Sequence, residues 1–105
     1  MASILKQLAS LNLTAAGTAQ ALSATPILAQ VVILNAKTGN TGLIYVGDSD
    51  VSATEAAFSL AAGETVIIPM AEMSGGNTDT DLKDWYFDGS TTNDDLLVGY
   101  LQRSN

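Results

Sequence analysis

Aspartate is the residue type in this chain that is both suited to chemistry and concentrated in one region. The last third of the sequence contains Asp79, Asp81, Asp84, Asp88, Asp94 and Asp95. Calcium binds six to eight oxygen ligands and accepts carboxylates from loops. A calcium site is therefore one hypothesis, with weak candidate ligands Asp79, Asp81, Asp88, Asp94 and Asp95. Their spacing does not match an EF-hand loop, and aspartate also favours turns and strand edges. Solvated turn and edge residues are the simpler interpretation.

The sequence contains no histidine and no cysteine. This absence removes thiolate nucleophiles, disulfides, zinc sites with nitrogen or sulfur ligands, and the usual general base. Glycoside hydrolysis needs only two carboxylates, but they must flank a cleft at a fixed separation, and a chain of 105 residues offers little room for one. We therefore expect no enzymatic activity, no catalytic residue and no cofactor.

Trp85, Tyr86 and Phe87 form the one aromatic cluster of the sequence. Alternation along a strand sends Trp85 and Phe87 to one face and Tyr86 to the other. Packing in the core is the preferred role for the Trp85 face. The alternative is a contact with a carbohydrate or a protein partner, because exposed aromatic rings serve both. Trp85 and Tyr86 are therefore candidate ligand-contact residues.

Short strands are the elements that must position these residues. Clusters of turn-forming residues occur at 16–17, 26, 38–42, 47–48, 62–64, 74–77 and 88–90. Between them, β-branched and aromatic residues predict strands at 29–36, 43–46, 57–60, 65–70, 85–88 and 96–101. The chain is expected to be one all-β domain over residues 1–105, a single antiparallel β-sandwich or jelly-roll-like barrel of about eight short strands.

Three loops between these strands have the length of hairpin turns. We therefore predict antiparallel hairpins that join 29–36 to 43–46, 57–60 to 65–70, and 85–88 to 96–101.

Two of the predicted strands lack the usual alternation, since residues 31–34 and 66–68 are apolar throughout. Such runs are typical of strands that are covered on both faces. The chain is also 47% apolar before its nine glycines are counted, and soluble monomers rarely expose large apolar patches. We therefore expect an oligomer or the subunit of a larger assembly.

The N-terminal residues 1–10 are expected to form an arm. Ile4, Leu8 and Leu11 fit a helical period, whereas Leu11 and Leu13 fit a strand. We predict an irregular segment over residues 1–8 and a strand from Ser10, and we see no signal peptide. An apolar arm needs a surface to lie on. The candidate interface residues are Ile4, Leu5, Leu8, Leu11, Val32 and Leu34.

The net charge of −7 comes from four basic and eleven acidic residues. Such a chain is repelled by phosphate backbones and by anionic lipid, so nucleic acid is not an expected partner. The longest apolar stretch, residues 27–34, is interrupted by Gln30 and is far shorter than a membrane span. We expect a soluble protein that is made in the cytoplasm of its producer and has no membrane partner.

Taken in order, these segments resemble a recurrent type of small tailed-bacteriophage virion protein. The matching segments are GT at 17–18, NA at 35–36, NTGLIYVG at 40–47, LAAGETV at 60–66 and DLKDWYFDG at 81–89. The resemblance covers residues 11–101, and its motifs are turns and core positions rather than catalytic ones.

The resemblance implies a jelly-roll-like β-sandwich in a phage particle. It suggests a capsid decoration or cement protein, present on the virion surface, that binds the major capsid protein as a homo-oligomer, with a trimer favoured. A fibre or tail module that binds host glycans is the alternative. Fold analogy does not fix function, so both are carried forward as expectations.

Overall fold

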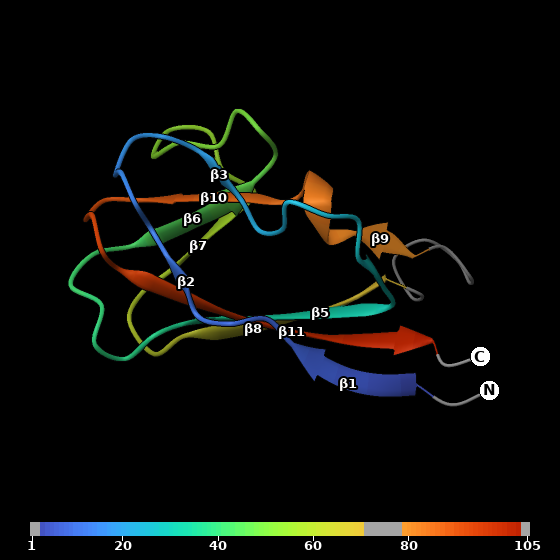
Figure 1. The fold of residues 1–105 in the computed structure, drawn as a ribbon. Helices are drawn as coiled ribbons and strands as arrows, with labels where there is room; N and C mark the ends of the chain where they lie inside the picture. The colour runs from blue at the N-terminus through green and yellow to red at the C-terminus, as the bar shows by residue number, and fades with distance from the viewer. Residues whose placement is uncertain (1–2, 71–78, 104–105) are drawn as a thin grey trace.

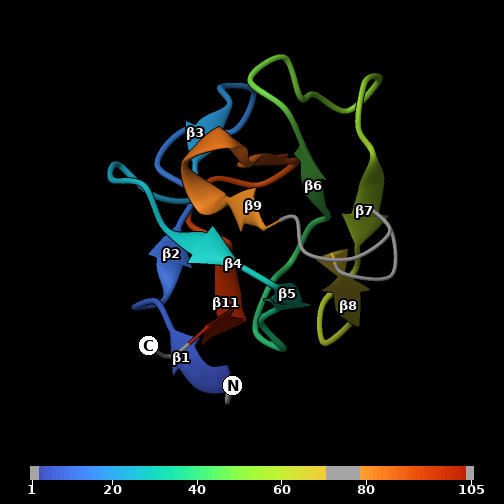
Figure 2. The ribbon, with the colours of Figure 1, turned by 90° about the vertical axis from the view of Figure 1, so that its right-hand side faces the viewer.

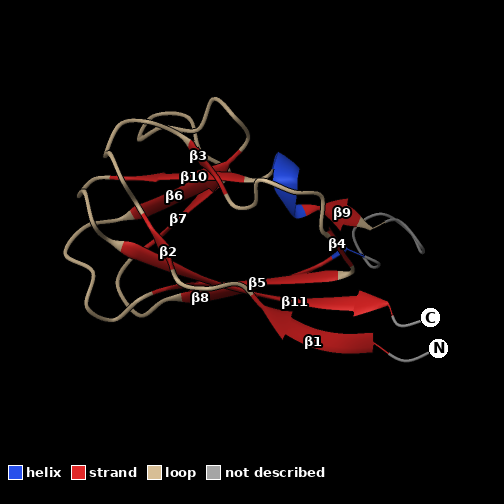
Figure 3. Cartoon of the chain, viewed as in Figure 1, coloured by secondary structure: helices blue, strands red, loops and turns tan. Residues whose placement is uncertain are grey.

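The computed structural model describes residues 3–70 and 79–103, so the predicted turn at 74–77 and residues 1–2 of the arm lie outside it. The described chain consists of antiparallel strands in two stacked layers (Figures 1 and 3). The predicted all-β sandwich is therefore confirmed. The layers are separate sheets and do not close into a barrel.

The first sheet has the strand order β1, β11, β5, β8, and β2 pairs with the other end of β11. These strands are β1 (Ser3–Gln7), β2 (Leu11–Asn12), β5 (Val31–Ala36), β8 (Thr65–Pro69) and β11 (Asp95–Arg103). The second sheet has the order β3, β10, β6, β7. Its strands are β3 (Gln20–Ala21), β6 (Ile44–Gly47), β7 (Phe58–Leu60) and β10 (Tyr86–Gly89).

A small third sheet lies at one end of the sandwich, between the two layers (Figure 2). It pairs β4 (Leu28–Ala29) with β9 (Thr80–Asp81), and β9 leads into the 3-10 helix η1 (Leu82–Asp84). The Asp81 side chain caps η1 by accepting the Lys83 N–H. This end piece places Leu82, which is fully buried, against the core.

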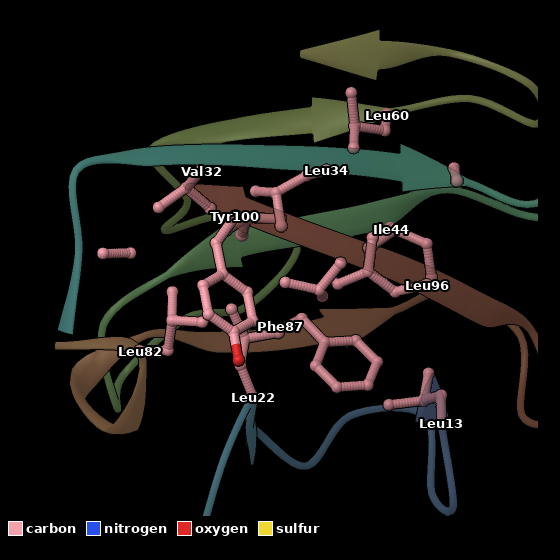
Figure 4. Packing of buried hydrophobic residues seen from close by; sticks show 14 residues of the cluster. Leu13, Leu22, Val32, Leu34, Ile44, Leu60, Leu82, Phe87, Leu96 and Tyr100 are labelled. Atoms are coloured by element: carbon pink, nitrogen blue, oxygen red, sulfur yellow. The ribbon is translucent and has the colours of Figure 1, made fainter. Parts of the chain in front are cut away.

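The core forms where the inner faces of the two sheets meet. Burial alternates along β5, with Val32 and Leu34 inside, although all four residues at 31–34 are apolar. From the second sheet, Phe87 and Ile44 point into the same space (Figure 4). The inner faces of a sandwich bury alternate residues of each strand. The predicted sharing of one face by Trp85 and Phe87 is consistent with this, since Trp85 packs against the same cluster.

The N-terminal segment is more regular than the sequence suggested. Residues 3–7 form β1, which pairs with the C-terminal half of β11, from Ser3 opposite Arg103 to Gln7 opposite Gly99. The prediction of an irregular segment is therefore wrong. A strand of this kind depends on its partner at the other end of the chain, which local patterns do not reveal.

All three predicted hairpins are wrong, although the strands themselves are present. β5 lies in the first sheet and β6 in the second, β7 in the second and β8 in the first, and β10 in the second and β11 in the first. Each connecting loop is therefore an arch that crosses between the layers. Turn residues mark where a chain reverses, but they do not determine whether the two flanking strands bond to each other.

Two of these arches are joined by a set of hydrogen bonds that we call the loop clasp, formed by Asn40, Thr41, Gly42, Asp94 and Asp95. The Asp94 carboxylate accepts the Thr41 N–H at 3.1 Å and the Gly42 N–H at 2.8 Å. The Asn40 side chain donates to the Asp95 carbonyl and accepts the Asp95 N–H, both at 2.8 Å. A Cβ on Gly42 would lie 2.5 Å from the Thr91 hydroxyl oxygen, so a larger residue there would have to displace that side chain.

We predict that Asp94→Ala lowers the free energy of unfolding by about 3 kcal/mol, because it leaves two backbone N–H groups without their charged acceptor. Asp94 is only 5% exposed, so water cannot replace the carboxylate without rearrangement. Urea denaturation measures the change. Asp50→Ala removes the same charge from an exposed turn and should cost no more than about 0.5 kcal/mol. Equal losses for the two variants would contradict a structural role for the clasp.

Candidate functional site

The outer face of the first sheet is an apolar surface built from four strands. Paired residues in a sheet point to the same side, and the register places Leu5, Leu101, Val31 and Pro69 in one row across the strands. The next row contains Ile33 and Ile67. We define the outer face by six side chains: Leu5, Val31, Ile33, Ile67, Leu97 and Leu101.

No part of the described chain covers this outer face. Leu5 is 66% exposed, Ile67 62% and Leu97 37%, and the other three side chains are half-buried. The polar positions among them, Gln7 and Asn35, are uncharged. The sequence predicted cover on both faces of β5, and the molecule itself supplies that cover on one face only.

The interface residues expected from the sequence are divided by the structure. Ile4 and Leu5 are exposed, whereas Leu8 and Leu11 pack partly against the core. Val32 and Leu34 are fully buried, which corrects their assignment to an interface. They occupy the inner positions of β5, so the outer positions of Val31 and Ile33 are the ones open to a partner. The run of four apolar residues in the sequence did not indicate which alternate pair faces out.

An apolar groove of about 610 Å³ lies between the edges of β7 and β8, which lie beside each other on one side of the sandwich (Figure 2). Its lining includes Val46, Phe58, Ile68 and Trp85. Phe58 and Val66 pack against the core but stay half-buried, so both add apolar surface to the groove. Asp48 and Asp84, both exposed, also line this groove.

The two aromatic contact candidates lie on different faces of the second sheet. Trp85 lines the groove, and its indole N–H donates to the Thr80 hydroxyl at 2.8 Å, which fixes the ring orientation. Tyr86 alternates with the inward-facing Phe87 and therefore lies on the outer side of β10. The two rings do not form one shared platform. Trp85 is accordingly the aromatic candidate for a ligand in the groove.

Two aspartates that we expected to be solvated are buried. Asp88 is 2% exposed, and its Oδ1 accepts the N–H groups of Gly17 at 2.8 Å and Gly89 at 2.7 Å. Asp94 is occupied by the loop clasp. Burial of a carboxylate is costly unless hydrogen bonds replace its water, and here backbone N–H groups do so, from the next residue and from Gly17 for Asp88 and from the 37–43 loop for Asp94. The interpretation as solvated turn residues is corrected for both.

The remaining calcium candidates also have protein partners. Asp81 accepts the Ile27 N–H, and Asp95 accepts the Asn12 side-chain amide at 2.9 Å. Asp79 likewise takes part in an interaction. Over residues 3–70 and 79–103, no three acidic side chains converge in a way that could hold a metal ion. In the described residues these carboxylates accept hydrogen bonds that join separate segments of the chain, and they do not gather into a cation site.

Comparison with known proteins found no matching family model, no similar curated protein and no similar solved structure. Within the described residues, no helix has the length and apolar character needed to cross a membrane. The candidate site therefore rests on the geometry of the outer face and the groove.

We predict that calcium does not stabilise the folded protein, because the candidate carboxylates already accept protein hydrogen bonds. A ligand present at about 100 times its dissociation constant adds roughly 2.7 kcal/mol to the free energy of unfolding. Urea denaturation in millimolar calcium and in a chelator should therefore give the same midpoint. A higher midpoint in calcium would contradict this assignment of the aspartates.

Proposed function

We propose that the chain is a structural, non-enzymatic protein of a tailed-bacteriophage particle. In this proposal it acts as a capsid decoration or cement protein that binds the major capsid protein on the outside of the head. The resemblance over residues 11–101 supports the phage setting. The structural observation that carries the proposal is the uncovered outer face.

The outer face has the properties of a docking surface rather than of ordinary solvent-facing sheet. Its three most exposed members, Leu5, Ile67 and Leu97, are large aliphatic side chains, and burial of such groups is favourable by about 25 cal/mol per Å². The open face of a sheet offers a broad surface that can pack against a complementary surface of a partner. A contact of modest strength repeated around a symmetric shell adds up to firm attachment.

The charge distribution supports the same orientation. The chain has a net charge of −7, yet the six side chains of the outer face and their neighbours Gln7, Asn35 and Thr65 are uncharged. Acidic residues lie mainly in loops, including the exposed Asp48 and Asp50. On the same side of β11, Asp95 lies two residues before Leu97, and its carboxylate is paired with Lys37 at 3.8 Å. Docking through the six apolar side chains leaves the acidic loops in water, where they keep particles apart.

We predict that Ile67→Asp weakens binding to capsids of the encoding phage at least about tenfold, because it places a charge in the apolar contact. Co-sedimentation with capsids that lack this protein measures binding, and capsid melting measures stabilisation. Ile67 is already 62% exposed, so the fold should tolerate the change. Because Ile67 also lines the groove, Leu97→Asp is made as well: Leu97 is not a groove residue, and its substitution should weaken capsid binding in the same way.

Leu43→Asp is the control for this experiment. Leu43 is also an exposed apolar residue, at 40%, but it lies in the loop that leads into β6 of the second sheet. It should bind capsids as the unchanged protein does. Absence of binding by the unchanged protein, or equal weakening by the control and the outer-face substitutions, would contradict docking through the outer face.

Ligand binding in the groove is a second candidate function, in line with a fibre or tail module that binds host glycans. The observation that favours it is the position of the half-buried Trp85 beside the carboxylate of Asp84 in one groove. An aromatic ring with a nearby carboxylate offers stacking and hydrogen bonds to a sugar.

Trp85 is the only tryptophan in the chain, so its fluorescence reports on the groove alone. If this second function is correct, a glycan found on an array should change the Trp85 emission saturably. Asp84→Ala should then weaken binding by about fivefold to tenfold, while Asp50→Ala should not. A glycan array without any bound sugar would exclude this candidate.

A further inference from the structure

The outer edge of β1 presents backbone hydrogen-bonding groups that point away from the sheet. The Leu8 N–H donates to the Val98 carbonyl at 3.0 Å. Hydrogen-bonded pairs alternate along an antiparallel ladder, and the register continues through Lys6 opposite Tyr100 and Ile4 opposite Gln102. These even-numbered residues therefore bond to β11. The N–H and carbonyl groups of Ser3, Leu5 and Gln7 face outward instead.

The opposite edge of the same sheet is protected in a way that β1 is not. Met70 N–H donates to the Gln30 carbonyl, and the register pairs Ile68 with Val32 and Pro69 with Val31. By the same alternation, Pro69 occupies an outward position of β8. Proline has no N–H to offer another strand, and natural sheets use it to block edges. β1 has no proline, and its residues 4–7 are all exposed.

We propose that β1 pairs with β1 of a second copy of this chain, antiparallel about a two-fold axis at Leu5. This register places Leu5 opposite Leu5 of the second copy and Ser3 opposite Gln7. It uses all of the outward-facing residues of β1, and each opposed pair of them exchanges two backbone hydrogen bonds. A contact that uses the same patch on both copies closes as a dimer.

This register places no two charged side chains opposite each other. Lysine on an edge strand commonly opposes strand addition, but here Lys6 lies opposite Ile4 of the second copy rather than opposite a second lysine. β1 contains no acidic residue, so two chains of charge −7 can approach through it with less repulsion than through their acidic loops. Figures 1 and 2 draw β1 at the margin of its sheet, with no labelled strand on its outer side.

The pairing has a consequence for the outer face. Residues directly opposite each other in a sheet point to the same side, so Leu5 of both copies joins the two outer faces into one apolar surface. The inference does not depend on the proposed capsid function, because it concerns the purified chain alone. The proposed assembly is a two-fold dimer, whereas the resemblance led us to expect a trimer.

Single cysteines test the register, since the chain has no native cysteine. Opposed residues of a hydrogen-bonded antiparallel pair have Cα atoms about 5.5 Å apart, which suits a disulfide. Leu5→Cys should therefore oxidise to a covalent dimer in nearly full yield. Gln7→Cys is the control, because its two copies would lie four residues apart along the strands, at roughly 14 Å, and should stay uncrosslinked.

Leu5→Pro tests the hydrogen bonds by sedimentation velocity. It removes an outward N–H and spares those that bond to β11, as Pro69 does in β8, and it should raise the dimer dissociation constant by about 30-fold. Leu5→Ala keeps the N–H and should have a smaller effect.

Three results would each overturn the proposal: an unchanged protein that is monomeric or trimeric, equal crosslinking of the two cysteine variants, or a dimer that Leu5→Pro does not affect. Capsid binding that fails while Leu5→Cys still crosslinks would reject the proposed function alone.

Discussion

The loop clasp is the constraint on which the rest of this structure depends. Asn40 and Asp95 exchange hydrogen bonds across 55 residues of sequence, and Asp94 binds the N–H groups next to Asn40. These contacts hold the 37–43 loop against the 90–94 loop, so both cross between the layers together. Because each of these two loops is an arch, the strands that it joins, β5 with β6 and β10 with β11, lie in opposite sheets, and β5 lies between β11 and β8.

The two outer surfaces of the sandwich differ in polarity, because their sheets present different residues at the outward positions. β5 lies inside the first sheet, and it carries apolar residues on both faces, of which the second sheet covers only the inner one. The outer side of the second sheet carries Tyr45, Ser59 and Asp88, and Asp88 is covered by the segment around Gly17. The apolar one of the two outer faces is the surface for which we propose a partner.

The sequence predicted what is local and missed what depends on distant partners. Strands occur at all six predicted segments, although 29–36 is divided into β4 and β5, because apolar periodicity and turn residues act over a few positions. The hairpins were wrong because an arch and a hairpin have similar loops, and only contacts such as Asn40 with Asp95 distinguish them. Among the site residues, Asp88 was expected in water because its partner Gly17 is 71 residues away. The outer positions Val31 and Ile33 become visible only when the register of β5 is known.

A reconstruction of the phage particle would test whether the outer face is covered by a larger assembly. Our account predicts density for this sandwich on the capsid surface, with Ile67 and Leu97 against the major capsid protein and the acidic loops in solvent. A particle without such density, or one in which the outer face of the first sheet points into solvent, would contradict it.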